Sequence, residues 1–130
     1  MAGAIALCVD PQDVGKVWFR VRGLILAALK RGTNETPIEE VECLLATGLM
    51  LLWLVMDGIE IVSAGVTQLS DGVCTLVAYG GRLEDHHLME AIENYARDED
   101  CKKVRVIGRE GWKRVLKEYR QPYIVLERTL

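Results

Sequence analysis

Three apolar segments near the middle of the chain, separated by two tight-turn signals, constrain the fold more than any other feature. Residues 49–56 are nearly all apolar, which predicts a central strand covered on both faces. The pair Asp57-Gly58 is a hairpin signal, and residues 59–69 return as the next strand. Ser70-Asp71-Gly72 marks a second turn before a strand at residues 73–79. This part of the chain is therefore predicted to form an antiparallel three-stranded meander.

The residues before the meander predict one strand and two helices. Residues 4–9 form a short apolar run, typical of a buried strand, that ends at Asp10-Pro11. Asp10 can cap a helix with Pro11 in its first turn, and apolar residues then recur at helical spacing as far as Leu29. Thr36-Pro37-Ile38-Glu39 has the pattern of a capping box, which predicts a second helix that ends at Gly48.

The residues after the meander predict two helices and two further strands. After Gly80-Gly81-Arg82, residues 83–98 have the spacing of an amphipathic helix, and residues 104–107 read as a short strand. A helix carrying Trp112, Leu116 and Tyr119 follows, Pro122 ends it, and residues 123–126 predict a last strand. The order β-α-α-β-β-β-α-β-α-β implies one α+β domain over residues 1–130, with a mixed, mostly antiparallel sheet and helices on both faces.

Composition narrows the classes of partner. The formal net charge is −3 and aromatic residues make up 6% of the chain, which argues against a nucleic-acid-binding domain. The longest apolar stretch is too short to span a membrane, and no signal peptide precedes it, so we expect a cytoplasmic protein without a membrane partner. The four cysteines have no CxxC spacing and are expected to be buried free thiols, and no metal site is expected.

The order of the elements resembles the GNAT fold, that of the Gcn5-related N-acetyltransferases. The likeness covers nearly the whole chain and is mainly topological, and small phage-encoded GNAT-like proteins are its nearest match. Several short strings carry it: Leu52-Trp53, Val66-Thr67, Gly80-Gly81 and above all GREGWKRVL at residues 108–116. The likeness implies a single GNAT-like domain, with acetyl-CoA as the cofactor wherever the enzyme activity is kept.

The resemblance also implies where the cofactor would bind. GNAT enzymes hold the acetyl-CoA pyrophosphate at the helix after the fourth strand, through the motif Q/R-x-x-G-x-G/A. The matching residues here are Gly80, Gly81 and Arg82, which could cradle an anion, but the motif's spacing is absent. Glu84 and Asp85 follow at the expected start of the helix, where they would repel a phosphate. A plain turn with an acidic helix start is the competing interpretation.

The catalytic residues that the resemblance implies are weakly matched. With Arg109 on the asparagine of the family pattern N-x-x-A-x-x-x-Y, Leu116 falls on the tyrosine, and Leu116 cannot donate a proton. Tyr119, one turn later, could substitute, although helical spacing puts it on the core face. The general base on the meander is equally open. Glu60 and Asp71 lie in the right region, but both sit beside hairpin turns, where exposed carboxylates are routine, and Glu60 is kept as a weak candidate.

Two groups of charged residues have competing interpretations. His86 and His87 with Glu90 lie at helical spacing, but they lack a further partner for a metal and are better explained as a solvated face. A basic cluster near the end of the chain includes Arg109, Lys113, Arg114 and Lys117, with Arg109 and Lys113, and Lys113 and Lys117, expected to share a helix face. That cluster is either a solvated face or a surface that binds anions or a protein partner.

Two hypotheses of different class follow. The first is a phage-encoded, degenerate GNAT-like protein that is non-catalytic, needs no cofactor, and acts through protein contacts, with other virion proteins as partners and the host cytoplasm or the virion as its location. The second is an N-acetyltransferase that moves an acetyl group from acetyl-CoA to a small amine or a lysine. Whether the chain is an enzyme stays open at this point, and so does a homo-oligomer.

Overall fold

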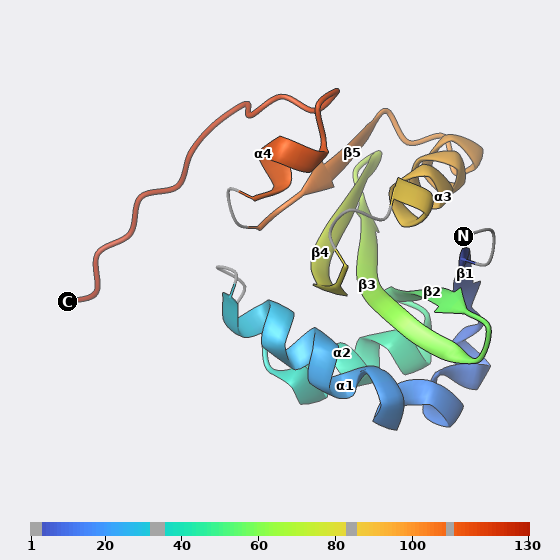
Figure 1. The fold of residues 1–130 in the computed structure, drawn as a ribbon. Coiled ribbons are helices and arrows are strands. Elements are labelled where there is room, and N and C mark those ends of the chain that lie inside the picture. Colours follow the sequence, from blue (N-terminus) through green and yellow to red (C-terminus); the bar gives the residue numbers. More distant parts are fainter. Residues whose placement is uncertain (1–3, 32–35, 83–85, 109–110) are drawn as a thin grey trace.

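A computed structural model describes residues 4–31, 36–82, 86–108 and 111–130, without the side chain of His86. Within these ranges the elements follow the predicted order from the first strand to the fourth helix (Figure 1). They are β1 (Ala4–Val9), a short 3₁₀ turn η1 (Pro11–Asp13), α1 (Val14–Arg31), α2 (Ile38–Thr47), β2 (Leu51–Asp57), β3 (Glu60–Ser70), β4 (Val73–Gly81), α3 (His86–Asp98), β5 (Lys103–Val106) and α4 (Trp112–Val115).

The strands form one five-stranded mixed sheet in the order β1-β2-β3-β4-β5. β1 to β4 are antiparallel to their neighbours, and β5 pairs parallel to β4. The predicted meander is confirmed as β2, β3 and β4. Its second turn consists of Asp71 and Gly72, with φ angles of 53° and 76°, which is the pair of positive values that a type I′ turn requires.

Helices cover both faces of the sheet, as predicted. α1 and α2 pack on one face, where Val21, Ile25 and Leu45 are completely buried against β2, β3 and β4. α3 packs on the other face, where Leu88 and Ile92 are completely buried against the same strands. β2 serves both cores, because strand side chains alternate between the two faces. Of the helices in the described ranges, none is long and apolar enough to span a membrane.

Of the two helix starts predicted from the sequence, the cap at Asp10 is confirmed and the cap at Thr36 is wrong. The Asp10 carboxylate accepts a hydrogen bond from the Gln12 N–H at 2.9 Å, so Asp10 caps the chain there as expected, with Pro11 in a 3₁₀ turn that leads into α1. At α2 the capping residue is Pro37 rather than Thr36, because the Pro37 carbonyl accepts the first helical hydrogen bonds. Gly48 ends α2 in the left-handed conformation, with φ of 81°, as its position predicted.

The predictions for the C-terminal part are wrong in two respects. The helix predicted through Trp112 and Tyr119 forms only over Trp112–Val115, because Leu116 leaves the helical conformation and turns into the core on the α3 side. The strand predicted at residues 123–126 is absent, and residues 121–130 are exposed and extended away from the domain (Figure 1). The apolar pattern of a strand produces a strand only where a sheet edge is within reach of it.

The cysteines are free, but only Cys74 is buried. Cys8 and Cys43 are exposed, which contradicts the prediction that the thiols lie in the core. Cys8 is exposed because β1 is an edge strand, so an apolar run there is covered less than one in a central strand. Burial raises the pKa of the Cys74 thiol to about 11, so this cysteine is not a thiolate nucleophile near neutral pH.

Candidate functional site

The most distinctive feature of the sheet is that its two parallel strands, β4 and β5, separate halfway along. They pair from Val73 opposite Lys103 to Leu76 opposite Val106, and the last contact is a hydrogen bond from the Ile107 N–H to the Leu76 carbonyl at 3.4 Å. β4 then continues to Gly81, and Figure 1 shows the two strands diverging. Within the described ranges, no strand pairs with this edge of β4 beyond Leu76.

A β-bulge lies at the point of separation. On β3, Val66 pairs with Ala78 and Thr67 with Leu76, which leaves Val77 as an extra residue in β4. As a result, Val77 and Ala78 both contact the α1 side, whereas Leu76 and Tyr79 contact the α3 side. A bulge bends its strand and increases the local twist. We attribute the divergence of β4 from β5 to this bulge.

A buried hydrogen bond holds β2 and β3 together beside the bulge. The Trp53 indole Nε1–H donates to the Thr67 hydroxyl at 2.8 Å, and both side chains are buried. Trp53 also packs edge-on against Tyr95 of α3, with ring centroids 5.5 Å apart. Thr67 is the β3 residue directly opposite Leu76, so this contact fixes the sheet where β4 begins to bend.

Gly80 and Gly81, predicted as cofactor-binding residues, lie at the free end of β4, and packing already requires both glycines. A Cβ on Gly80 would lie 2.5 Å from the Leu24 carbonyl oxygen of α1. A Cβ on Gly81 would collide with the Val62 carbonyl oxygen, and Gly81 has a φ of +109°. Their lack of side chains is thus explained by contacts with α1 and β3 without an anion.

Arg82 is exposed directly after β4, and its backbone is tied to the sheet. The Tyr79 hydroxyl donates to the Arg82 carbonyl oxygen at 2.5 Å and also shares a hydrogen bond with the Ser63 hydroxyl at 3.1 Å. Ser63 is completely buried, so Tyr79 satisfies a polar group that would otherwise be costly. The acidic residues Glu84 and Asp85 lie outside the described residues.

Trp112 of α4 packs against Tyr79 on the α3 side of the sheet. The two rings meet edge to face, with centroids 5.2 Å apart and an interplanar angle of 83°. A Cβ on Gly108 would lie 2.7 Å from the Trp112 Nε1, so a glycine there lets the chain pass close to the indole ring. The C-terminal part of the motif at residues 108–116 therefore packs beside the free edge of β4.

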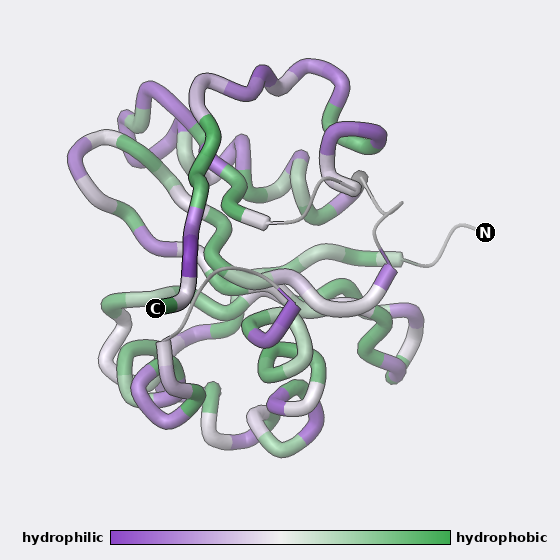
Figure 2. Tube along the Cα trace, turned by 90° about the vertical axis from the view of Figure 1, so that its left-hand side faces the viewer, coloured by the Kyte–Doolittle hydropathy of each residue, from purple (hydrophilic) through white to green (hydrophobic). Residues whose placement is uncertain are grey.

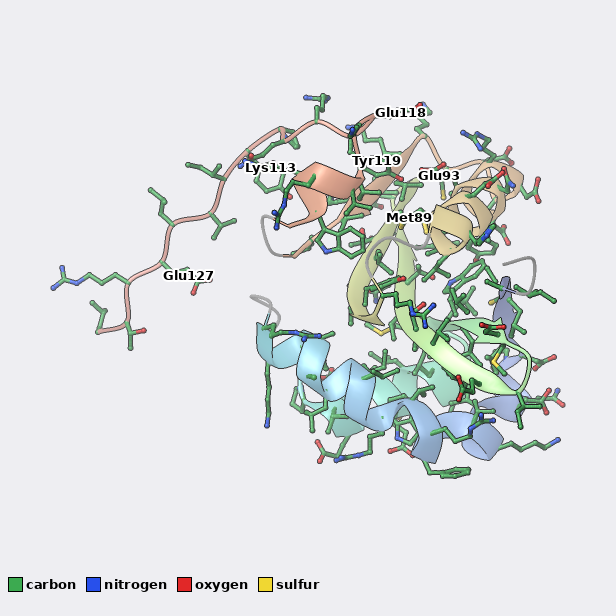
Figure 3. The ribbon with its side chains drawn as sticks, in the orientation of Figure 1. Met89, Glu93, Lys113, Glu118, Tyr119 and Glu127 are labelled. Atoms are coloured by element: carbon green, nitrogen blue, oxygen red, sulfur yellow. The ribbon has the colours of Figure 1, made fainter. Side chains whose placement is uncertain are left out.

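Tyr119, the predicted candidate for a general acid, lies on the surface of α3. Its hydroxyl donates to Glu93 Oε2 at 2.6 Å, and Figure 3 shows the two side chains facing each other. Burial, followed by the contact with Glu93, raises the pKa of Tyr119 well above its usual range. A phenol with a raised pKa is a poorer proton donor, so this geometry fits an anchor between the C-terminal segment and α3 better than an acid.

The remaining predicted site residues are scattered over the surface. Glu60 is exposed at the start of β3 and pairs with Asp57 across the hairpin, at the same end of the sheet as Gly81. Lys113 and Arg114 are exposed on α4, and Lys117 is exposed beyond its end. Because α4 ends at Val115, Lys113 and Lys117 do not share a helix face, contrary to the prediction.

Arg109, the other predicted member of that basic cluster, lies outside the described residues. The described helix α4 begins at Trp112, so it does not include the helix face expected for Arg109 and Lys113. The described residues contain no cluster of three or more His, Cys, Asp or Glu side chains that could hold a metal ion.

A shallow depression of about 260 Å³ opens at the opposite end of the sheet from Gly81. It is lined by Gly48, Leu49, Leu51, Thr67, Leu69 and Tyr95. None of these residues is charged, and the Thr67 hydroxyl already accepts a hydrogen bond from Trp53. The depression therefore lacks the cations that a phosphate-bearing ligand needs, and the free end of β4 is the better candidate site.

Sequence reasoning missed the bulge at Val77 and the network around Tyr79. Residues 73–79 are nearly all apolar, so no break in an alternating pattern was available to reveal an extra residue. The pairing of Tyr79 with Ser63 depends on the strand register, which the sequence pattern does not contain.

No family model matches the sequence, and no curated protein matches it significantly. Solved structures do match the fold. One is an aminoglycoside acetyltransferase from an uncultured soil metagenomic sample, in complex with sisomicin, with a TM-score of 0.70 and 12% identity over 98% of this chain and 96% of that chain. The fold is that of the GNAT acetyltransferases.

Two other matches extend over the full length as well. A predicted acetyltransferase from Clostridium acetobutylicum, solved with acetyl-CoA, has a TM-score of 0.66 and 13% identity over 97% of this chain and 96% of that chain. A ribosomal-protein-alanine N-acetyltransferase from Brucella melitensis biovar Abortus 2308 has a TM-score of 0.65 and 8% identity over 98% of both chains. At such identities the likeness establishes the GNAT-like fold and leaves ligand and substrate open.

Proposed function

We propose that this chain binds acetyl-CoA along the free edge of β4 and transfers the acetyl group to an amine. The observation that carries the proposal is the separation of β5 from β4 after Leu76, which leaves the edge of β4 from Val77 to Gly81 without a strand partner in the described chain. The similarity in fold to an acetyltransferase solved with acetyl-CoA supports the same ligand.

The chemistry of the edge fits the ligand. An unpaired strand edge presents backbone N–H and C=O groups in a row, and an extended chain that contains amides can pair with them as an added strand would. The pantetheine arm of acetyl-CoA is such a chain, with two amides along its length. When bound, acetyl-CoA supplies an activated acyl group, and backbone N–H groups near the bulge at Val77 can stabilise negative charge on its carbonyl oxygen.

The phosphate end of the ligand would meet Arg82, which is exposed at the end of β4. The start of α3 is the weaker contact, because Glu84 and Asp85 precede it in the sequence and would repel a phosphate. The glycine pair does not add to this fit, because α1 and β3 already fill the space around Gly80 and Gly81. We therefore assign the phosphate contact to the Arg82 side chain, with Gly80 and Gly81 shaping the end of β4.

An amine acceptor must lose a proton and the departing thiolate must gain one. Tyr119 is assigned an anchoring role, since its hydroxyl donates to Glu93 and its pKa is raised. Glu60 stays a predicted base only: it lies at the same end of the sheet as Gly81, which is the phosphate end of the proposed ligand and is away from the bulge at Val77, so its position does not support this role. Whether the acceptor is a small amine or a lysine is left to a panel of substrates.

The first experiment is hydrogen–deuterium exchange with and without acetyl-CoA. Binding should slow the exchange of amides in residues 77–82, whereas the amides of β1, which is the edge strand on the far side of the sheet from β4 and β5, should be unaffected. If saturating acetyl-CoA left the exchange of residues 77–82 unchanged, or slowed the exchange of β1 to the same extent, the proposed site would be wrong. Turnover is then measured as thiol release from acetyl-CoA in the presence of small amines and lysine peptides.

The role of Arg82 is separated from bulk charge by a matched pair of variants. Arg82→Ala should weaken binding of acetyl-CoA and of adenosine 3′,5′-bisphosphate, while binding of pantetheine alone should be unchanged. Lys102→Ala is the control, because Lys102 is exposed just before β5, at the opposite end of the β4–β5 pair. Equal losses in the two variants would mean that only net charge matters.

The competing candidate is a non-catalytic GNAT-like protein that acts through protein contacts. It is favoured by the glycine pair, which packing accounts for without a cofactor, and by Tyr119, whose hydroxyl is occupied by Glu93. A phage origin, a place in the virion, a cytoplasmic location and virion proteins as partners stay predictions, which the fold does not address. Absence of acetyl-CoA binding at millimolar concentration would favour this candidate.

A further inference from the structure

Arg105 of β5 is a partly buried arginine whose charge has no partner among the described residues. Its guanidinium group takes part in none of the hydrogen bonds or ion pairs within those ranges. An arginine side chain is always charged, and a charge that is partly withdrawn from water is stabilised by an anion. Arg105 is therefore suited to bind an anionic group that comes from outside the described chain.

The strand pairing places Arg105 where β4 and β5 begin to separate. Arg105 is the partner of Thr75, and the pairing ends one residue later. Val77, the extra residue of the bulge, follows two residues after Thr75, which is about 7 Å along a strand. Arg105 thus starts within one side-chain length of the bulge, where the proposed site places the acetyl group.

Arg105 faces the α1 side of the sheet. Val104 and Val106 pack against the core on the α3 side, so the residues that alternate with them face the opposite way. Lys103 on that face is exposed, and Ile107, which continues the alternation, is 45% exposed. This face of β5 is therefore accessible to a ligand.

The acceptor amine has to reach the acetyl group from the same face. On the α3 side, Trp112 packs edge to face against Tyr79, beside the free edge of β4. Figure 2, seen from the left-hand side of Figure 1, shows the layering, with α1 and α2 below the sheet and α3 and α4 above it. The C-terminal segment thus covers the α3 side of the free edge, and the α1 side is the one to which Arg105 belongs.

The charge around Arg105 on this face is positive as well. Lys103 lies two residues earlier in β5, and α1, which packs on this face, ends in Lys30 and Arg31, both of them exposed. The acidic residues Glu39 and Glu40 belong to α2, whereas α1 is the helix that packs closely against β4. Such a surface favours an anionic acceptor and disfavours a polycation.

We propose that Arg105 holds a carboxylate of the acceptor, so that the preferred acceptor is a free amino acid whose α-amine is directed at the acetyl group beside Val77. A carboxylate matches a guanidinium group through two parallel hydrogen bonds. Ile107, on the same face, offers an apolar contact to the side chain of the amino acid, which makes leucine a suitable probe. This inference rests on the acetyl transfer proposed above and adds the chemical class of the acceptor.

The reaction needs no further reagent. The neutral amine nitrogen attacks the acetyl carbonyl carbon, so that an N–C bond forms and the C–S bond to CoA breaks. The amine loses one proton to water, and the departing thiolate takes one up. The products are an N-acetylamino acid and free CoA.

The first test compares acceptors that differ in the carboxylate. Thiol release from acetyl-CoA is measured with leucine, leucinamide and 3-methylbutylamine. The kcat/KM for leucine should exceed each of the others at least about tenfold, which is the discrimination expected from a charge-assisted hydrogen-bonded pair. The amine of leucinamide loses its proton more easily than that of leucine, so basicity cannot produce this preference. Equal values for leucine and leucinamide would overturn the proposal.

The second test assigns the preference to Arg105. Arg105→Gln should lower kcat/KM for leucine at least about tenfold and leave that for leucinamide unchanged, whereas Arg105→Lys should keep part of the preference. Lys103→Gln is the control, because it removes the same charge from the same face, two residues farther from the bulge, and it should keep the full preference. Equal losses in Arg105→Gln and Lys103→Gln, or a loss with leucinamide as well, would overturn the proposal.

The third test separates this inference from the proposed function. Binding of N-acetylleucine and N-acetylleucinamide to the chain without CoA is followed by nuclear magnetic resonance titration, which needs no turnover. The wild type should bind the acid at least about tenfold more tightly than the amide, and Arg105→Gln should bind both equally. Protection of residues 77–82 by acetyl-CoA without this preference would overturn the role of Arg105 and leave the proposed function standing. Absence of acetyl-CoA binding would contradict the proposed function, and the titration would still decide whether Arg105 holds a carboxylate.

Discussion

At the scale of single residues, the glycines show how a side chain can be excluded by its neighbours. Gly80 lies where α1 crosses β4, and the Leu24 carbonyl oxygen occupies the space that a Cβ would need. Gly23 is on the same helix, one residue before Leu24, and a Cβ there would meet nothing within 4 Å. A methyl group at the two positions should therefore have opposite effects on stability, because Gly80 lies in the helix–strand contact and Gly23 is exposed beside it.

We predict that Gly80→Ala destabilises the protein by ~1–3 kcal/mol, because backbone atoms of α1 must move to admit a methyl group. Gly23→Ala should stabilise it by up to ~1 kcal/mol, since alanine is favoured over glycine within a helix. Urea denaturation of the two variants and the wild type measures both effects. Similar free energies for Gly80→Ala and the wild type would mean that α1 adjusts freely, and the packing explanation of this glycine would be wrong.

At the scale of elements, the C-terminal segment depends on tertiary contacts rather than on helix propensity. α4 has only four residues, which is too short to be stable by itself. What holds the segment in place is the burial of Leu116, the contact of Trp112 with Tyr79, and the hydrogen bond from Tyr119 to Glu93. Helix α3 therefore positions the segment that leads to residues 121–130 (Figure 3).

We predict that Tyr119→Phe lowers the free energy of unfolding by about 1 kcal/mol at neutral pH, through loss of the hydrogen bond to Glu93. The pKa of Tyr119 is raised in the folded state from a usual value near 10, so its contribution is complete below pH 10 and declines as the pH rises further. The free energy of unfolding of the wild type should fall above pH 10, and that of Tyr119→Phe should fall less steeply.

The measurement is urea denaturation between pH 7 and 11, with Glu118→Gln as the control. Glu118 is exposed beside Tyr119 and should change neither the stability nor its pH dependence. Parallel pH profiles for Tyr119→Phe and the wild type would show that the phenol does not contribute in this way. Cys74, Cys8 and Tyr95, whose pKa values are also raised by burial, contribute to the part of the decline that remains in the variant.

At the scale of the whole molecule, the two hydrophobic cores share the same strands. Leu52 and Leu54 of β2 belong to the core under α1 and α2, and Trp53 and Val55 belong to the core under α3. Loss of β2 from the sheet would therefore open both cores. Trp18 reports on one core and Trp53 on the other, so fluorescence can follow each of them separately.

We predict that both cores unfold in one cooperative transition. A variant that keeps only Trp18 (Trp53→Phe, Trp112→Phe) and one that keeps only Trp53 (Trp18→Phe, Trp112→Phe) are unfolded in urea. In each variant the fluorescence transition should coincide with that of far-ultraviolet circular dichroism. A fluorescence transition in the Trp53 variant that precedes the loss of secondary structure would instead identify the α3 side as a separately unfolding unit.

The candidate site was predictable only in part. Gly80, Gly81 and Arg82 were expected at the end of the fourth strand, and the structure places them there. The open edge of β4, which carries the functional proposal, depends on the bulge at Val77. An extra residue in an apolar strand has no signature in the sequence, because every side chain around it is apolar whichever face it occupies.

The sequence by itself determined the α+β class, the meander and the placement of helices on both faces, because these follow from local patterns of turns and apolar spacing. Only the tertiary structure decided where β5 leaves β4, that Tyr119 is bonded to Glu93, and that residues 123–126 extend away from the domain rather than form a strand. These features depend on contacts between residues far apart in the chain. Local propensity does not specify such contacts, since they arise from the packing of elements that are already formed.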